Sequence, residues 1–188
     1  MYIAQLCCVG TKQRNMIEKE ETFRNGAIME MAKQIAVAAR TAPKARGTDN
    51  LEIAVLSGDD LARLADRMQS IADATGQAFF ARDAENIRQC GAVLLIGSRV
   101  APLGLNCGYC GFATCGEKGR EVPCFFNAND LGIAIGSAAA RAADLRIDNR
   151  VMFSAGRTAL EMNLLPDCTM ILALPLAAKG KSPFFDRK

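Results

Sequence analysis

Four of the eight cysteines in this chain fall within residues 105–124, which read LNCGYCGFATCGEKGREVPC. Their spacing is Cys107-x2-Cys110-x4-Cys115-x8-Cys124. Four glycines and a proline lie among them, with few aliphatic side chains. Such a segment cannot bury enough apolar surface to order itself. We therefore expect the four thiols to converge on a bound inorganic group that holds this loop together.

The absence of histidine narrows the identity of that group. Histidine-dependent nucleophile pairs and imidazole ligands are excluded, so a metal site must use sulfur and oxygen. Gly108 and Gly111 allow left-handed backbone angles and can aim N–H groups at the sulfurs. The pattern favours an iron–sulfur cluster, for which we expect the 4Fe-4S type, although four ligands do not distinguish a four-iron cluster from a two-iron one. A structural zinc ion and four independent thiols are the alternatives.

The remaining cysteines are weaker candidates for ligands of the bound group. Cys90 competes with Cys124 as the fourth ligand, which is the weakest of the four assignments. Cys7, Cys8 and Cys168 are interpreted as unrelated thiols, and Cys168 as a small core residue beside a strand.

Composition sets the remaining limits on what the chain does. It has 188 residues, enough for one domain, and its net charge of +3 is too weak to predict binding to nucleic acid or to a membrane surface. No apolar run reaches the roughly 18 residues of a membrane-spanning helix. Residues 1–15 lack a signal-peptide pattern, so we expect a cytoplasmic protein with reduced thiols. We interpret residues 1–15 as a flexible tail or an over-called start, and residues 16–188 as a single domain.

Helical and strand patterns alternate along that domain. Residues 92–96 are apolar throughout and lie between two glycines, which predicts a central strand covered on both faces. The expected helices are Met16–Ala42, a helix capped by Asp59 or Asp60 and ending at Gly76, a turn at Asp83–Gln89, Asn127–Leu145 and Thr158–Asn163. The expected strands are Leu51–Leu56, Ala78–Phe80, Ala92–Ile96 and Thr169–Leu174. We predict an α+β fold with α/β-like alternation, into which the cysteine loop, residues 105–125, is inserted.

Three segments resemble a known family. The cysteine loop, residues 39–51 (ARTAPKARGTDNL) and residues 127–137 (NANDLGIAIGS) together are similar to uncharacterised proteins that contain a ferredoxin domain. The resemblance covers about residues 16–188. It implies an iron–sulfur site and names no reaction.

A second resemblance is to flavin-dependent nitroreductases. Residues 42–55 (APKARGTDNLEIAV) look like their turn and strand after the first long helix, although Glu52 replaces their usual aromatic residue and their arginine-serine-x-arginine signature is missing. Asp130–Leu145 looks like their central dimer helix. The resemblance implies a nitroreductase-like central sheet flanked by helices, a homodimer, and FMN. The candidate FMN contacts are Arg40, Lys44, Arg46, Gly47 and Arg187.

The positive charge of the turn at residues 44–47 agrees with the implied contact to FMN. Lys44 and Arg46 bring two positive charges to one turn, and Gly47 permits close backbone approach, as a phosphate needs. A solvated basic turn explains the same residues without a ligand. Three functions follow: a homodimeric flavin-dependent oxidoreductase fed by the cluster, an electron carrier or redox sensor that uses the cluster with a redox protein partner, or a zinc-stabilised binding module.

Overall fold

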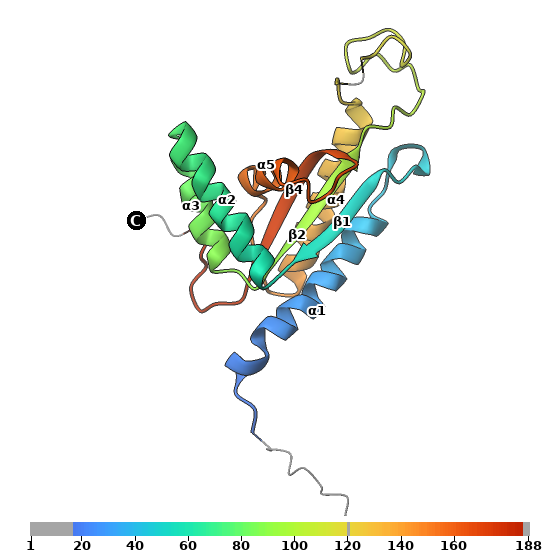
Figure 1. The fold of residues 1–188 in the computed structure, drawn as a ribbon. Coiled ribbons are helices and arrows are strands. Elements are labelled where there is room, and N and C mark those ends of the chain that lie inside the picture. Colours follow the sequence, from blue (N-terminus) through green and yellow to red (C-terminus); the bar gives the residue numbers. More distant parts are fainter. Residues whose placement is uncertain (1–16, 120, 186–188) are drawn as a thin grey trace, which may run out of the picture.

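The computed structural model describes residues 17–119 and 121–185. Helices and strands alternate in it around a single sheet (Figure 1). The elements in chain order are α1 Glu20–Thr41, a 3₁₀ turn Ala45–Gly47, β1 Leu51–Leu56, α2 Asp59–Thr75, α3 Ala78–Arg88, β2 Ala92–Arg99, α4 Phe125–Asp144, β3 Asp148–Asn149, α5 Phe153–Glu161 and β4 Cys168–Ala177.

The four strands form one antiparallel sheet in the order β1-β2-β4-β3. The β2 side chains alternate between the two faces of the sheet, as the period of a strand requires. Val93 and Leu95 pack into the core beneath α2, α3 and α5. Leu94 and Ile96 pack into the core beneath α1 and α4. The result is a three-layer α+β sandwich, in which β2 is the covered central strand that the sequence predicts.

Several predicted boundaries are confirmed. Helix α1 ends at Thr41, two residues before Pro43, which disfavours helical geometry in the residue before it. Helix α2 ends at Thr75, and Gly76 closes it in the left-handed conformation with φ 71°. The strand predicted at residues 51–56 matches β1.

Other predictions are wrong, each for a local reason. Residues 78–80 open helix α3 and do not form a strand, because Phe80, Ala84 and Ile87 recur at helical spacing and bury one face against α2. The expected caps Asp59 and Asp60 lie inside the first turn of α2, where no side chain caps the helix.

Three helix boundaries also differ. Helix α1 begins at Glu20, after residues 17–19 without helical structure, while Met16 lies outside the described residues. Helix α4 begins two residues before the predicted start, at Phe125. Helix α5 begins at Phe153, five residues before the predicted start, and ends at Glu161. Within the described part of the chain, no helix is long and apolar enough to cross a membrane.

Candidate functional site

The cysteine loop connects the end of β2 to the start of α4. It projects from one end of the sandwich (Figure 1), and its described residues contain neither helix nor strand. The backbone is left-handed at Asn106, Gly108 and Gly111, as expected for the two glycines. The N–H of Cys115 donates to Oδ1 of Asn106 at 2.8 Å, and the N–H of Gly111 donates to the Gly108 carbonyl at 2.9 Å. The second bond closes a tight turn around Cys110, and the first ties Cys115 back to the residue before Cys107.

An aromatic cluster ties the tip of the loop back to α4. The Tyr109 ring lies 5.0 Å from Phe125 and 6.1 Å from Phe126, measured between ring centroids. Tyr109 stands between Cys107 and Cys110, whereas the two phenylalanines directly follow Cys124. The contact therefore brings the first cysteine pair and the last cysteine to the same end of the loop. We call Tyr109, Phe125 and Phe126 the aromatic clasp.

The thiols themselves are free and differ in exposure. Cys107, Cys110 and Cys115 are half-buried, while Cys124 is buried at the N-cap position of α4. Among the described residues, no three cysteine or carboxylate side chains lie close enough together to share a metal ion. The four-ligand set stays a prediction. Its chemistry nevertheless fits an iron–sulfur cluster or zinc, because all the donors are sulfur and the glycines let the loop adjust around them.

The competing cysteine, Cys90, lies in a different environment. It immediately precedes β2, whereas the loop follows the other end of this strand. Eight strand residues separate those ends by roughly 25 Å, at about 3.3 Å per residue. Burial raises the pKa of the Cys90 thiol to about 12, and its Sγ donates to the Asn86 carbonyl at 3.1 Å. Cys90 is therefore a core thiol at the far end of the sheet, and Cys168 is buried in the same core.

The basic turn predicted to contact FMN is held by its own chain. Arg40 donates to Oδ2 of Asp49 at 2.7 Å and to the Leu51 carbonyl at 2.9 Å. Partial burial opposes ionisation of Asp49, but the hydrogen bonds from Arg40 and the Leu51 N–H and the nearby charges of Arg40 and Lys44 together outweigh it and lower the pKa of Asp49 below its usual range. Lys44 donates to carbonyls in the last turn of α1 and at the residue that follows, so its charge caps the end of that helix.

The rest of this turn links α4 to the base of the cysteine loop. The Ala45 N–H donates to both oxygens of the buried Asp130 carboxylate, at 3.1 and 3.2 Å. Arg46 has φ 56° and donates to the Leu103 carbonyl at 2.6 Å. Gly47 is left-handed, as predicted, with open space around it. Three of the predicted contacts are therefore occupied by protein oxygens, and Arg187 lies outside the described residues.

A larger cavity lies beside the C-terminal segment, which we call the tail pocket. Its volume is about 960 Å³, and four of its lining side chains are cationic, against the single carboxylate of Glu85. The lining residues are Arg82, Glu85, Asn86, Gln89, Arg150, Lys179, Lys181, Ser182, Pro183 and Phe184. Arg150 donates to the Phe184 carbonyl at 3.1 Å and lies 5.8 Å from the centroid of the Phe185 ring. Both the size and the charge of this pocket suit an anionic, organic ligand.

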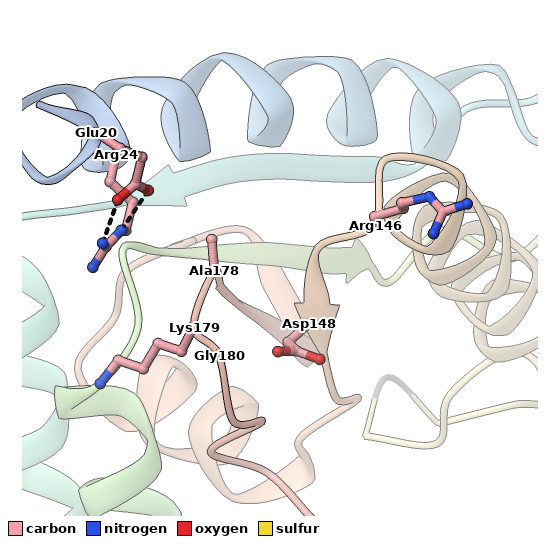
Figure 2. Close-up of a pocket in the computed structure, with 7 residues that line it drawn as sticks. All are labelled: Glu20, Arg24, Arg146, Asp148, Ala178, Lys179 and Gly180. Carbon is pink, nitrogen blue, oxygen red and sulfur yellow. Dashed lines mark hydrogen bonds and ion pairs between the residues drawn. The ribbon is translucent and has the colours of Figure 1, made fainter. Parts of the chain in front are cut away.

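A smaller cleft next to it suits a ligand less well. This cleft has a volume of about 510 Å³ and lies between the start of α1, the segment at β3 and the residues after β4. Figure 2 shows the residues that line it. Glu20 neutralises Arg24 through an ion pair. Lys179 turns toward Gln89 of the neighbouring helix region, with Nζ 3.4 Å from Oε1, and Arg146 points away from the others. The charges of this cleft do not converge on one point.

Residues of the tail pocket escaped sequence reasoning for a clear reason. Arg82, Arg150 and Lys179 are single basic residues on three separate segments, and only the fold brings them together. The clasp carried a readable signal, since Phe125 and Phe126 directly follow the last loop cysteine.

Comparison with solved structures defines the class of fold. A crystal structure described as an oxidoreductase containing FMN superposes with TM-score 0.56, at 17% identity over 81% of this chain and 67% of that chain. A nitroreductase family protein from Clostridium novyi NT gives TM-score 0.56, at 18% identity over 84% and 76%. A nitroreductase with bound FMN from Desulfitobacterium hafniense DCB-2 gives 0.55, at 16% identity over 84% and 82%. The fold is nitroreductase-like, as the second resemblance predicts.

Sequence comparison then gives the family. An uncharacterized protein from Archaeoglobus fulgidus is 39% identical over 182 residues, covering 92% of this chain and 98% of that protein. The model of the family described as "uncharacterized protein containing a ferredoxin domain" (DUF2148) matches residues 120–187, which include Cys124 and lie after the other three loop cysteines. The chain belongs to this family, and the first resemblance is confirmed.

Proposed function

We propose that this chain is an iron–sulfur flavoprotein of the oxidoreductase class. Its cysteine loop would hold a 4Fe-4S cluster, and its tail pocket would hold FMN. Membership of a ferredoxin-domain family supports the cluster, and the fold shared with FMN-containing oxidoreductases supports the flavin. The observation that carries the proposal is the loop itself, whose four cysteines occupy a segment without a core, with the ring of Tyr109, between the first two cysteines, in contact with Phe125 and Phe126 after the last.

In the loop, each residue type has a separate role. Cys107, Cys110, Cys115 and Cys124 would bind iron through their thiolates. A bound cluster supplies one-electron transfer. Gly108 and Gly111 let the backbone turn tightly between the cysteines, and the Gly108 amide could donate a hydrogen bond to the anionic centre, whereas the Gly111 N–H already donates to the Gly108 carbonyl. The clasp covers one side of that centre and limits access of water.

In the tail pocket, the cations would bind the flavin phosphate. Arg82, Arg150 and Lys179 surround the cavity, and Arg187 follows directly in the chain after the described tail. The side-chain amides of Asn86 and Gln89 offer donors and acceptors for the polar edge of a flavin ring. FMN supplies the two-electron chemistry, while these residues bind and orient it.

The basic turn takes a different role in this proposal. Arg40, Lys44 and Arg46 donate to protein oxygens, and Arg82, Arg150 and Lys179 do so as well. We assign the phosphate to the tail pocket because it is a cavity of about 960 Å³ lined by four cationic side chains. Gly47 remains available for close approach by a ligand, because no atom lies within 4 Å of the position that a Cβ would occupy.

The cysteine loop projects from one end of the molecule, whereas helix α3, which lines the tail pocket, lies toward the other end (Figure 1). Electron transfer weakens steeply with distance, so the cluster and the flavin of a single copy are poorly placed to exchange electrons. We therefore propose a homodimer in which the loop of one copy approaches the flavin of the other. Helix α4 offers a contact face, where Gly132 and Gly136 meet open space and Ile133 is exposed. Small side chains there would let a second helix approach closely.

The deciding experiment is cofactor analysis of protein purified without oxygen. We expect about four iron and four sulfide per chain, together with near-stoichiometric FMN. Replacing Arg150 with alanine should lower FMN occupancy and leave iron unchanged, whereas the matched Arg46→Ala variant should retain FMN. Zinc as the sole metal, at about one per chain, would replace this proposal with a zinc-stabilised binding module.

One observation favours a second function, that of an electron carrier or redox sensor without flavin. Leu105, Tyr109 and Phe125 are all exposed around the cysteine loop, which offers an apolar surface for a redox protein partner. A protein that contains the cluster, exchanges electrons with a ferredoxin and binds no added FMN would establish this alternative.

A further inference from the structure

Asn127 has a buried side-chain amide, and only one of its two polar atoms is hydrogen-bonded. Its side chain is 1% exposed, and its Oδ1 accepts from the Ala101 N–H at 3.1 Å. Its Nδ2 is buried and has no hydrogen-bond partner among the described residues. Leaving such a donor unpaired costs about 1–3 kcal/mol. Buried polar groups in folded proteins nearly always have a partner, so the missing acceptor calls for an explanation.

The position of Asn127 indicates where that acceptor would lie. Cys124 is the N-cap residue of α4, and Asn127 follows it by three residues, so the two side chains share one face of the helix. No side chain caps this helix start, which leaves its first N–H groups without a side-chain acceptor. The positive end of the helix and the spare amide donor thus lie at the same place.

The bond to Ala101 also fixes the direction of the amide. Ala101 lies just before the cysteine loop and Asn127 just after it, so this bond closes the neck of the loop. With Oδ1 held by Ala101, Nδ2 cannot rotate away without breaking the closure. The donor is therefore fixed in the first turn of α4, three residues after Cys124 and at the neck of the loop.

We propose that Asn127 is a positioning residue for the cluster, donating its Nδ2–H to the sulfur of Cys124 or to an adjacent cluster sulfide. This inference rests on the proposed iron–sulfur site and identifies Cys124, not Cys90, as the ligand beside the helix start. A donor to sulfur stabilises the reduced, more negative cluster more than the oxidised one. Asn127 should therefore raise the reduction potential and slow the loss of iron.

The test compares three anaerobically purified proteins: wild type, Asn127→Leu and Asn127→Gln. The leucine variant keeps the volume and removes both polar atoms. We expect its midpoint potential to fall and its iron to be lost to a chelator roughly 10- to 100-fold faster. The glutamine variant, which restores an amide, should recover part of both effects. Asn50→Leu is the matched control, since Asn50 Nδ2 is also buried and unpaired but lies outside α4, and it should leave the potential unchanged.

The outcomes separate this inference from the proposed function. Wild-type protein without iron and sulfide overturns the proposed function. Iron-loaded wild type, combined with an unchanged potential and unchanged iron loss in Asn127→Leu, overturns the role of Asn127 alone. If the leucine variant does not load iron, wild-type protein labelled with ¹⁵N-asparagine replaces it. Pulsed EPR of the reduced cluster should then detect a nitrogen coupling that Asn127→Gln lacks, and its absence in wild type excludes the hydrogen bond.

Discussion

Strand β2 and the cysteine loop are neighbours in sequence and opposites in structure. From Ala92 to Ser98, every β2 residue is buried, and its apolar side chains fill both cores. Between residues 104 and 123, no described residue is buried. The strand is therefore specified by burial on both faces, whereas the loop has only local turns and the aromatic clasp. Substitutions in the strand should change stability, and substitutions in the loop should change cofactor binding.

The largest effect is expected for Leu95→Ala, in the centre of β2. Leu95 is fully buried, so the change should leave a cavity and lower the free energy of unfolding by about 2–5 kcal/mol. The matched loop variant, Leu105→Ala, removes a side chain that is 42% exposed and should shift it by no more than about 0.5 kcal/mol. Urea unfolding of metal-free protein measures both. Equal losses in the two variants would mean that the loop shares the core.

A smaller effect is expected for Gly156→Ala, where α5 meets β4. An added Cβ would lie 2.1 Å from the Ile171 carbonyl oxygen, so helix and strand must move apart. We expect a loss of about 1–3 kcal/mol in the free energy of unfolding. Gly26→Ala in α1 is the control, because its Cβ meets open space and alanine favours helix, stabilising the protein by up to about 1 kcal/mol. A neutral Gly156→Ala would show that α5 packs loosely.

Sequence reasoning succeeded where one segment carries the whole signal. The apolar run at residues 92–96 predicts a central strand, and Pro43 and Gly76 predict two helix ends, because each depends on local backbone chemistry. It failed at Phe79 and Phe80, whose strand propensity was overridden by packing of α3 against α2.

The candidate site residues also fall into two groups: those that lie in one segment of the sequence and those that only the fold brings together. The four loop cysteines could be found from their spacing within one short segment. The tail pocket could not, because Arg82, Arg150 and Lys179 are far apart in sequence and acquire meaning only when α3, the segment after β3 and the chain end meet. The basic turn shows the same limit, and its contact with FMN stays a prediction. Its charge was visible in the sequence, but the carbonyl and carboxylate groups that occupy Arg40, Lys44 and Arg46 were not.

Within the described residues, the two ring contacts of Tyr109 with Phe125 and Phe126 join the loop to α4. Tyr109→Ala removes ring contacts worth about 0.5–1.5 kcal/mol at most, because Tyr109 is 68% exposed. Stability should barely change, while protease cleavage within residues 104–123 of the metal-free protein should speed up. Phe79→Ala, which removes a similar ring pair with Phe80 at 4.7 Å, should leave loop cleavage unchanged. Identical digestion of all three proteins would show that the clasp does not hold the loop.

The smallest perturbation is thiol labelling, which alters no residue before the measurement. Burial raises the pKa of Cys90 to about 12 and that of Cys168 to about 11, so both thiols stay protonated at pH 8. The thiols of Cys107, Cys110 and Cys115 lie in the loop, outside both hydrophobic cores. With iodoacetamide at pH 8, mass spectrometry of metal-free protein should find these three modified and the two core thiols intact.

The pH dependence of stability supplies the matching check on the core thiols. In the unfolded chain a cysteine thiol ionises at about pH 8.5, whereas in the folded protein Cys90 and Cys168 keep their protons to higher pH. Between these limits the folded protein binds more protons than the unfolded chain, so stability must fall as pH rises. The contribution of these two protonated thiols to the free energy of unfolding is complete below about pH 8.5 and is lost as pH rises toward 11 to 12. A Cys90→Ala variant should flatten part of this decline, whereas Cys110→Ala in the loop should not. Labelling of Cys90 at the rate of the loop thiols would instead place it at the surface, where it could again compete with Cys124 for iron.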